Sequence, residues 1–166
     1  MDQGIEEKIF IRLITQEDVE AVEKLITKVM AQFDCIGEGY SINDPEVQDM
    51  YSAYSGSQSA FYVIDNGKEI LGCGGIAPLK NGKATVCELR KMYFYQALRG
   101  KGFGKKLLTL LIERAHDLGY KQMYLETVER MEAANKLYQK NGFKALCTNK
   151  GDTGHVACDL YYIKDL

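Results

Sequence analysis

Histidine is scarce in this sequence, and cysteine motifs are absent. The 166 residues include two histidines and five cysteines, with no C-x-x-C pair. An odd number of scattered cysteines argues against a disulfide framework, and a zinc site needs clustered Cys and His ligands. We therefore predict no metal site and expect most cysteines to be small buried hydrophobes. A reactive thiol at Cys87 or Cys147 is the alternative, and it would need an electropositive, accessible setting.

Long apolar runs are missing as well. No run approaches the roughly 18 residues that a membrane-spanning helix needs. The N-terminus carries Glu6, Glu7 and Lys8 where a signal peptide would be apolar. The formal net charge of −2 gives no general attraction to nucleic acid. These absences predict a soluble, cytoplasmic protein whose partners include neither a membrane nor a nucleic acid.

Linker signals are also rare. The chain has two prolines, no low-complexity stretch and no internal repeat. A chain of 166 residues that is 46% hydrophobic and 27% charged is long enough to bury one sizeable core. We therefore expect residues 1–166 to form a single domain.

Hydrophobic periodicity and turn signals predict a mixture of helices and strands. Thr15-x-x-Asp18 is typical of a capping box that opens a helix, and Asp44-Pro45 is typical of the start of a second helix. Asn66-Gly67 is a strong hairpin signal. We expect helices at 19–29, 45–54, 103–118 and 130–140, and strands at 8–14, 61–65, 70–77, 83–95, 122–126, 143–146 and 156–163.

The strand expected at 83–95 is apolar on both parities. Val86, Met92 and Phe94 fall on one side, and Cys87, Leu89 and Tyr93 fall on the other. Such a strand is covered on both faces. Simple alternation places Glu88 on the side of Val86, so we expect its carboxyl group to be desolvated.

Residues 98–104, with the sequence Leu-Arg-Gly-Lys-Gly-Phe-Gly, join this strand to the helix at 103–118. Glycines at 100, 102 and 104 allow a phosphate to approach the backbone. The first turn of the helix offers free N–H groups and the positive end of its dipole. Arg99, Lys101, Lys105 and Lys106 add positive charge. The segment therefore predicts a cradle for a small polyanion.

Two common phosphate-binding motifs do not fit this turn. A P-loop would need glycine at the position of Arg99 and Ser or Thr at the position of Lys106. The dinucleotide fingerprint G-x-G-x-x-G would need glycine at the position of Lys105 or Leu107. The sequence therefore argues against both nucleoside triphosphate hydrolysis and dinucleotide binding.

The spacing Arg99-x-x-Gly102-x-Gly104 resembles the pyrophosphate-binding signature of the GCN5-related N-acetyltransferase (GNAT) superfamily. Downstream residues strengthen this resemblance, because they are similar to the family's last helix and its turn. They are Glu126-Thr127, Met131, Ala134, Asn135, Leu137-Tyr138 and Asn141-Gly142-Phe143. The resemblance implies an α+β, GNAT-like acyl-CoA N-acyltransferase fold, in which helices flank a central, mostly antiparallel mixed sheet.

The resemblance also implies acetyl-coenzyme A as the cosubstrate, with no metal. The residues it assigns to coenzyme binding are Met92, Tyr93, Phe94, Arg99, Gly100, Lys101, Gly102, Phe103, Gly104, Lys105, Asn135 and Tyr138. Relatives use backbone donors on the preceding strand to hold an oxyanion, which here points first to Met92. Asn135 has a second interpretation, in which its amide bonds the neighbouring turn.

Acetyl transfer to an amine needs a base, because an alkyl amine with a pKa of about 10 is mostly protonated at neutral pH. We predict Glu88 for this role, with a pKa raised by desolvation. The alternative is a structural ion pair with Arg90, which would lower that pKa. Tyr138 matches the tyrosine that relatives use as general acid toward the leaving thiolate. Its alternative is a core aromatic with one wet end.

Two weaker candidates lie on the acceptor side. His155 is one, although a loop histidine is usually solvated, and Glu126 is the other, although a carboxylate before a helix commonly compensates the dipole. The predicted function is an N-acetyltransferase that acts on a primary amine of a small molecule by direct attack in a ternary complex. A protein or peptide N-acetyltransferase and a non-catalytic acyl-CoA-binding module remain alternatives. A homodimer is expected by analogy with relatives alone.

Overall fold

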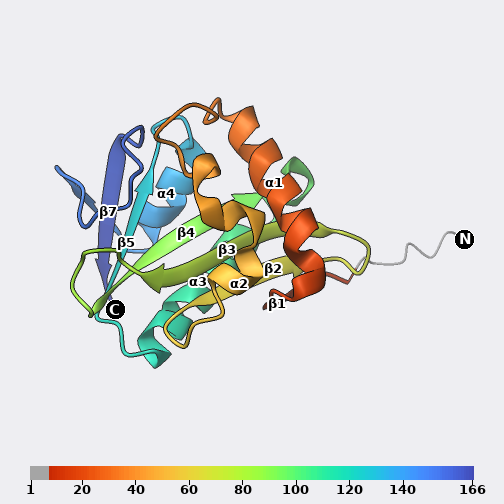
Figure 1. The fold of residues 1–166 in the computed structure, drawn as a ribbon, viewed down its shortest axis with the longest axis horizontal. Helices are drawn as coiled ribbons and strands as arrows, with labels where there is room; N and C mark the ends of the chain where they lie inside the picture. The colour runs from red at the N-terminus through yellow and green to blue at the C-terminus, as the bar shows by residue number, and fades with distance from the viewer. Residues whose placement is uncertain (1–7) are drawn as a thin grey trace, which may run out of the picture.

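A single β-sheet runs through the molecule and carries helices on both of its faces (Figure 1). The computed structural model describes residues 8–166, and in these residues the sheet has seven strands in the order β1-β2-β3-β4-β5-β7-β6. The strands are β1 (Phe10–Leu13), β2 (Ala60–Asp65), β3 (Ile70–Pro78), β4 (Val86–Phe94), β5 (Gln122–Thr127), β6 (Lys144–Leu146) and β7 (Leu160–Asp165).

Neighbouring strands in the described sheet are antiparallel, apart from the parallel pair β4 and β5. A parallel pair needs a crossover connection, and α3 (Phe103–Asp117) provides it. This arrangement confirms the predicted α+β class with a mostly antiparallel mixed sheet.

The sheet separates the core into two layers, each covered by helices. α1 (Val19–Gln32) and α2 (Met50–Ala53) pack on one face of the sheet, and α3 and α4 (Glu132–Lys140) pack on the other. In α1 the buried positions Val22, Leu25, Ile26 and Val29 recur three and four residues apart, which is the spacing of one helical face. No helix in the described part of the chain is both long and apolar enough to cross a membrane.

Two predicted elements were wrong in their extent. The helix expected at 45–54 is split into a 3-10 turn, Pro45–Gln48, and the short α2, because Asp49 leaves helical geometry (φ −152°) and caps the N–H of Ser52. The strand expected at 156–163 begins only at Leu160, because the Cys158 N–H bonds to the His155 carbonyl in a turn. Local hydrogen bonds overrode the hydrophobic pattern in both places.

β4 contains a bulge in its second half. The pairing of β3 with β4 shifts between Cys73 and Gly75, so β4 has one extra residue at this point. The backbone of Lys91 takes the left-handed conformation there, with φ 54°, which is uncommon for a residue with a side chain.

The bulge makes the predicted alternation along β4 wrong. Met92 packs in the α3-side core together with Leu89, although simple alternation places these residues on opposite faces. Glu88 instead borders a cavity with Asp44 and Glu46, which come from the α1 side. One inserted residue shifts a period of two by one step, so every residue after it changes face.

Lys91 also fixes the segment between α1 and α2 onto β4. Its ammonium group donates to the Ser41 carbonyl at 2.9 Å and to Asp44 Oδ2 at 2.6 Å, and it lies 3.6 Å from Glu46 Oε1. The side chain is 1% exposed. A buried ammonium group is tolerated because carboxylates and a carbonyl replace its water.

β4 and β5 separate beside this bulge. Their ladder joins residues 86–88 to residues 122–124, after which β4 continues to Phe94 and β5 continues to Thr127. β5 stays paired with β7 over this stretch. The divergence leaves an opening at the carboxyl ends of the two parallel strands, where α/β sheets commonly bind ligands.

Replacing Lys91 by Met is expected to lower the free energy of unfolding by about 2 kcal/mol, because the Ser41 carbonyl and Asp44 lose a buried partner. Urea unfolding followed by circular dichroism measures the change. Lys24→Met is the matched control, since Lys24 pairs with Glu20 on the exposed surface of α1 and should contribute little. Equal losses in the two variants would contradict the anchoring role.

Candidate active site

The glycine-rich turn ends in a helix terminus that faces open space. Gly100 and Gly102 adopt φ angles of 74° and 81°, and Gly102 caps α3. The N–H of Lys106 bonds back to the Gly102 carbonyl, so the N–H groups of residues 103–105 have no intrahelical partner. A Cβ atom at Gly100 or Gly102 would meet no atom within 4 Å. The turn therefore presents bare backbone and the positive end of a helix, which together suit an anion.

A groove of about 500 Å³ runs beside this turn, and we call it the glycine-turn groove. Its walls come from α1, the end of β4, the start of α3 and the segment that leads into α4. Eight residues predicted to bind the coenzyme line it, namely Met92, Tyr93, Phe94, Arg99, Gly100, Gly102, Gly104 and Lys105.

Four residues predicted for the same role lie outside that lining. Lys101 is exposed, and Phe103 packs half-buried against the α3-side core. Tyr138 lines a neighbouring cavity. Asn135 is buried within the start of α4. A coenzyme contact stays a prediction for all twelve residues.

Asn135 holds the chain between β5 and α4. Its Nδ2 donates to the carbonyl oxygens of Val128 at 3.0 Å and Glu129 at 3.4 Å. Its Oδ1 is buried and has no partner among the described residues. The side chain therefore makes the turn contact that was its second interpretation.

Two arginines join the rim of the groove to the C-terminal end of α1. Arg99 donates from Nη2 to Gln32 Oε1 at 3.0 Å. Arg130 donates from Nε to the Phe33 carbonyl at 2.9 Å and from Nη2 to the Tyr40 hydroxyl at 3.0 Å. The sequence pattern did not indicate Arg130, because the carbonyl that it caps lies 97 residues away in the chain.

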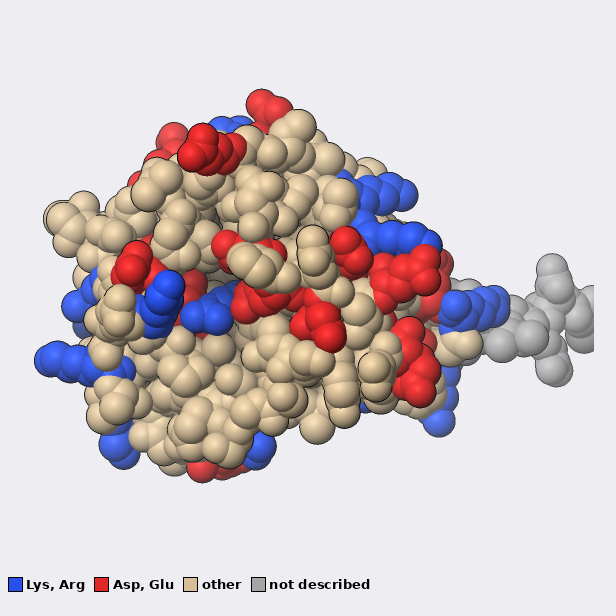
Figure 2. Space-filling model, in the orientation of Figure 1, with Lys and Arg blue, Asp and Glu red and all other residues tan. Residues whose placement is uncertain are grey.

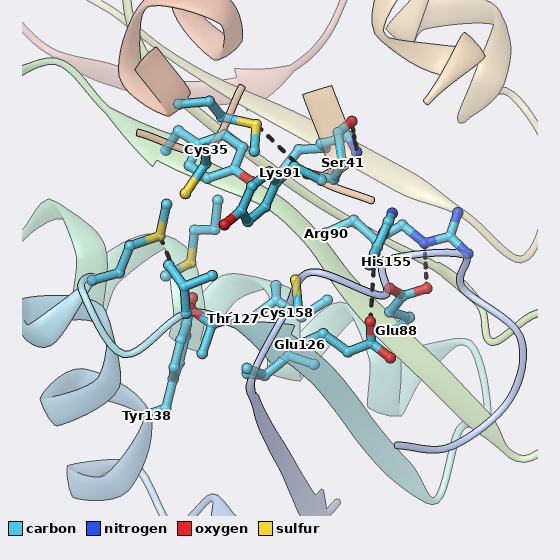
Figure 3. Close-up of a pocket in the computed structure, with 18 residues that line it drawn as sticks. Cys35, Ser41, Glu88, Arg90, Lys91, Glu126, Thr127, Tyr138, His155 and Cys158 are labelled. Carbon is cyan, nitrogen blue, oxygen red and sulfur yellow. Dashed lines mark hydrogen bonds and ion pairs between the residues drawn. The ribbon is translucent and has the colours of Figure 1, made fainter. Parts of the chain in front are cut away.

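A second cavity, of about 50 Å³, lies in the opening between β4 and β5. We call it the central cavity (Figure 3). It shares Met92, Tyr93 and Met131 with the glycine-turn groove. The two spaces are therefore neighbours across the end of β4.

Glu88 forms one side of the central cavity (Figure 3). The residue is 2% exposed, and Arg90 Nε donates to its Oε2 at 2.7 Å. The ion-pair alternative is therefore right about the contact but wrong about the pKa. Burial outweighs the attraction of Arg90 and raises the pKa of Glu88 above its usual value.

The other oxygen of Glu88 stays open. Oε1 has no hydrogen-bond partner among the described residues. It is not fully enclosed by protein either, because Asn135 Oδ1 is the one side-chain oxygen or nitrogen in the described residues that is both fully enclosed and without a partner. Glu88 thus lines the cavity and keeps one oxygen that can receive a proton.

Tyr138 approaches the central cavity from α4, on the side opposite Glu88 (Figure 3). Its ring is held by Phe143 and Tyr162, whose ring centroids lie 5.7 and 6.1 Å away. Burial raises the pKa of its hydroxyl, so the group keeps its proton at neutral pH. The hydroxyl has no hydrogen-bond partner among the described residues and is not fully enclosed by protein. Tyr138 therefore combines core packing with an unused O–H donor.

His155 joins two carboxylates from distant segments. Its Nε2 lies 2.7 Å from Asp44 Oδ2, and its Nδ1 lies 3.6 Å from Glu126 Oε2. Burial opposes protonation, but hydrogen bonds to the two carboxylates raise the pKa of His155 to about 9. The loop histidine that sequence reasoning treated as solvated is instead a largely enclosed imidazolium group, with a side chain 9% exposed.

Glu126 faces the site rather than a helix terminus. Burial alone would raise its pKa, but hydrogen bonds from His155, Thr153 and Tyr124 lower it. Each of its oxygens accepts a hydroxyl donor at 2.7 Å. Glu126 is thus a fixed, ionised acceptor that orients its neighbours.

A third cavity, of about 170 Å³, opens beyond Glu88, and we call it the outer cavity. It shares Glu88, Arg90 and His155 with the central cavity. Figure 2 shows acidic side chains gathered across the middle of the face that α2 covers. The complete lining is Asp44, Pro45, Glu46, Lys80, Glu88, Arg90, Asp152, Thr153 and His155.

Three cysteines, Cys87, Cys158 and Cys147, are poor candidates for a nucleophile at this site. Cys87 is buried, and its burial raises the pKa of the thiol to about 12. Cys158 lines the central cavity, and burial raises its pKa to about 12 as well. Cys147 is exposed and lines none of the three cavities.

Comparison with known proteins decides the family. The model of the acetyltransferase (GNAT) family matches residues 23–143. The uncharacterized N-acetyltransferase YjgM of Escherichia coli (strain K12) is 38% identical over 157 residues, which cover 94% of this chain and 94% of that protein. The chain belongs to the acetyltransferase (GNAT) family.

Solved structures share the GNAT fold with this chain. A GNAT-family acetyltransferase from Staphylococcus aureus Mu50 has a TM-score of 0.78 at 20% identity, over 95% of this chain and 99% of that one. A GCN5-related N-acetyltransferase from Kribbella flavida has a TM-score of 0.73 at 24% identity, over 95% and 98%. The predicted family and fold are confirmed, and so is the enzyme class, an acetyl-CoA-dependent acyltransferase.

The glycine-turn groove fits the donor that GNAT acyltransferases use. Acetyl-coenzyme A has an anionic diphosphate and a long uncharged arm. The bare backbone at Gly100 and Gly102 suits the diphosphate, and Ala133 and Ala134 leave an uncharged wall for the arm. Gly104 lines the groove as well and also lies close to α4, because a Cβ there would lie 3.2 Å from Leu137 Cδ2.

We expect the imidazole of His155 to titrate near pH 9. The folded-state pKa is raised from 6.5 to about 9, so the stabilisation it gives is complete below pH 6.5 and is lost as the pH rises through about 9. Proton NMR of the His116→Gln protein, in which His155 is the remaining histidine, records the midpoint. Asp44→Asn should move it downward, and an unshifted midpoint of about 6.5 in the parent would contradict the bridge.

Proposed function

We propose that this GNAT chain transfers the acetyl group of acetyl-coenzyme A to a primary amine of a small molecule, by direct attack in a ternary complex. The observation that carries the proposal is the row of three adjoining cavities. The central cavity shares lining residues with the glycine-turn groove on one side and with the outer cavity on the other. A donor in the groove and an acceptor in the outer cavity would meet between Glu88 and Tyr138.

Glu88 is suited to remove the proton of the acceptor. An ammonium group cannot attack a thioester, so one proton must leave before or during attack. The raised pKa of Glu88 brings it closer to the pKa of an amine, which improves proton transfer. Glu88 lines both the central and outer cavities and its Oε1 has no partner, whereas Arg90 holds Oε2 and so fixes the direction of the carboxylate.

Tyr138 is suited to protonate the departing sulfur. Bound acetyl-coenzyme A supplies an activated acetyl thioester. As the amine nitrogen forms its bond to the acetyl carbon, the carbon–sulfur bond breaks and the electron pair leaves with sulfur. Glu88 takes the proton from nitrogen, and Tyr138 Oη gives a proton to the thiolate.

Past residue 88, β4 continues without pairing to β5, so its backbone near Met92 borders the reacting centre. This backbone is our candidate for the donor to the oxyanion.

Release of free thiol from acetyl-coenzyme A in the presence of an amine panel tests the proposal. Tyr138→Phe is expected to lower kcat on the order of 100-fold while coenzyme affinity is kept, because it removes the acid but not the ring.

In the parent protein, kcat/KM should rise with pH as Glu88 loses its proton, and Glu88→Gln should abolish that rise.

Three results would contradict the proposal. Unchanged turnover in Tyr138→Phe would leave that residue with packing alone. Coenzyme binding without thiol release for any amine or peptide would favour the non-catalytic acyl-CoA-binding alternative. Release with a peptide but with no small amine would favour the protein-acetylating alternative.

Gly102→Ala should weaken the binding of acetyl-coenzyme A by about tenfold or more, because a methyl group would stand where the diphosphate approaches the backbone. Gly119→Ala is the matched control. Gly119 has a φ of 87° and, like Gly102, has no atom within 4 Å of a Cβ, but it lies outside the groove. Isothermal titration compares the two, and equal affinity losses would show that backbone strain alone is responsible.

A further inference from the structure

The cations in the wall of the outer cavity are already bonded to the protein. Arg90 donates from Nε to Glu88 at 2.7 Å and from Nη2 to the Pro78 carbonyl at 3.1 Å, and its Nη1 lies 3.6 Å from Glu46 Oε2. All three nitrogens of the guanidinium group therefore face protein oxygens. Two carboxylates, those of Glu88 and Glu46, therefore already compensate the charge of Arg90.

The two deeper cations are committed in the same way. Lys91 donates to the Ser41 carbonyl and to Asp44, and it lies close to Glu46. His155 has one ring nitrogen against Asp44 and the other toward Glu126. Lys80 is the remaining cation of the lining, and it stands at the exposed rim.

Acceptor atoms, in contrast, are left open. Glu88 lines the outer cavity, and its Oε1 has no partner among the described residues although the side chain is 3% exposed. Asp44 directs Oδ2 to both Lys91 and His155, whereas its Oδ1 receives no hydrogen bond from the described residues. A bound group that donates hydrogen bonds would find these oxygens available.

The charge count points the same way. Four carboxylates, of Asp44, Glu46, Glu88 and Glu126, face the three cations of Arg90, Lys91 and His155. One negative charge is therefore unbalanced when all seven groups are ionised. A bound ammonium group would balance it and would favour the ionised form of Glu88, which is the form that acts as a base.

We infer that the acceptor is a cationic amine that carries no carboxylate or phosphate, and that Asp44, Glu46 and Glu88 select for it. This inference rests on the proposed function. An amine, amide or hydroxyl substituent meets open carboxylate oxygens. An anionic substituent would lose its water beside like charges and would find no uncommitted cation in the inner wall.

Three acceptors that share one carbon chain test the inference. L-lysine, L-lysinamide and 1,5-diaminopentane present the same terminal amine, but only lysine has a carboxylate. With acetyl-coenzyme A saturating, kcat/KM for the diamine and for lysinamide should exceed that for lysine by about tenfold or more. Lysinamide controls for size, because its amide has nearly the shape of the carboxylate. An equal or higher value for lysine would overturn the inference.

A charge variant then tests the named residues. Glu46→Gln frees Arg90 from a carboxylate, so the preference for lysinamide over lysine should shrink by severalfold. Glu113→Gln removes the same charge from the exposed surface of α3 and should leave the preference unchanged. Equal preferences in the parent and in Glu46→Gln would overturn the role of Glu46.

The inference and the proposed function can fail separately. If no amine releases thiol, the proposed function fails, and the acceptor inference is decided by titrating lysinamide and lysine onto the protein saturated with coenzyme A. Tighter binding of lysinamide would support the selection of cations, whereas equal binding, tighter binding of lysine or no binding of either would overturn it.

Discussion

The site depends on the extra residue in β4. At Lys91 the strand takes a left-handed step, which places Met92 in the α3-side core and leaves Glu88 facing the segment that precedes α2. The same residue sends its ammonium group back to Asp44, so the bulge and the wall of the outer cavity are held by one side chain. Because β5 stops pairing with β4 just before this point, the bulge lies beside the opening that becomes the central cavity.

Buried charge explains how the arrangement is held together. Carboxylates and cations in this region are removed from water, so each is tolerated only when others compensate it. His155 and Lys91 meet on Asp44, and Arg90 joins Glu88 to Glu46, so the loop before β7, the segment before α2 and β4 are held together. The atoms left over from this pairing, Glu88 Oε1 above all, are the ones available to a substrate.

Several features could be predicted because they depend on residues a few positions apart. The capping box between Thr15 and Asp18 is present, and Gly142 takes the expected positive φ of 86° after α4. The glycine turn likewise depends on its own backbone and on the helix that follows it. One signal went unused. Gly74-Gly75 lies opposite the bulge, and a Cβ at Gly74 would lie 3.2 Å from Met92 Cγ, so glycines inside a strand marked the place where two backbones approach closely.

The sequence by itself indicated the family through the resemblance of its motifs, and that resemblance also pointed to the candidate acid. The glycine turn suited to an anion and the candidate base follow from residue type and short spacing. Only the tertiary structure decided which face Glu88 occupies, which partners His155 takes and what Asn135 bonds. His155 and Asp44 are 111 residues apart, and Lys91 and Asp44 are 47 apart. Their pairing arises from strand register and burial, which depend on the whole sheet and leave no periodic trace along the chain.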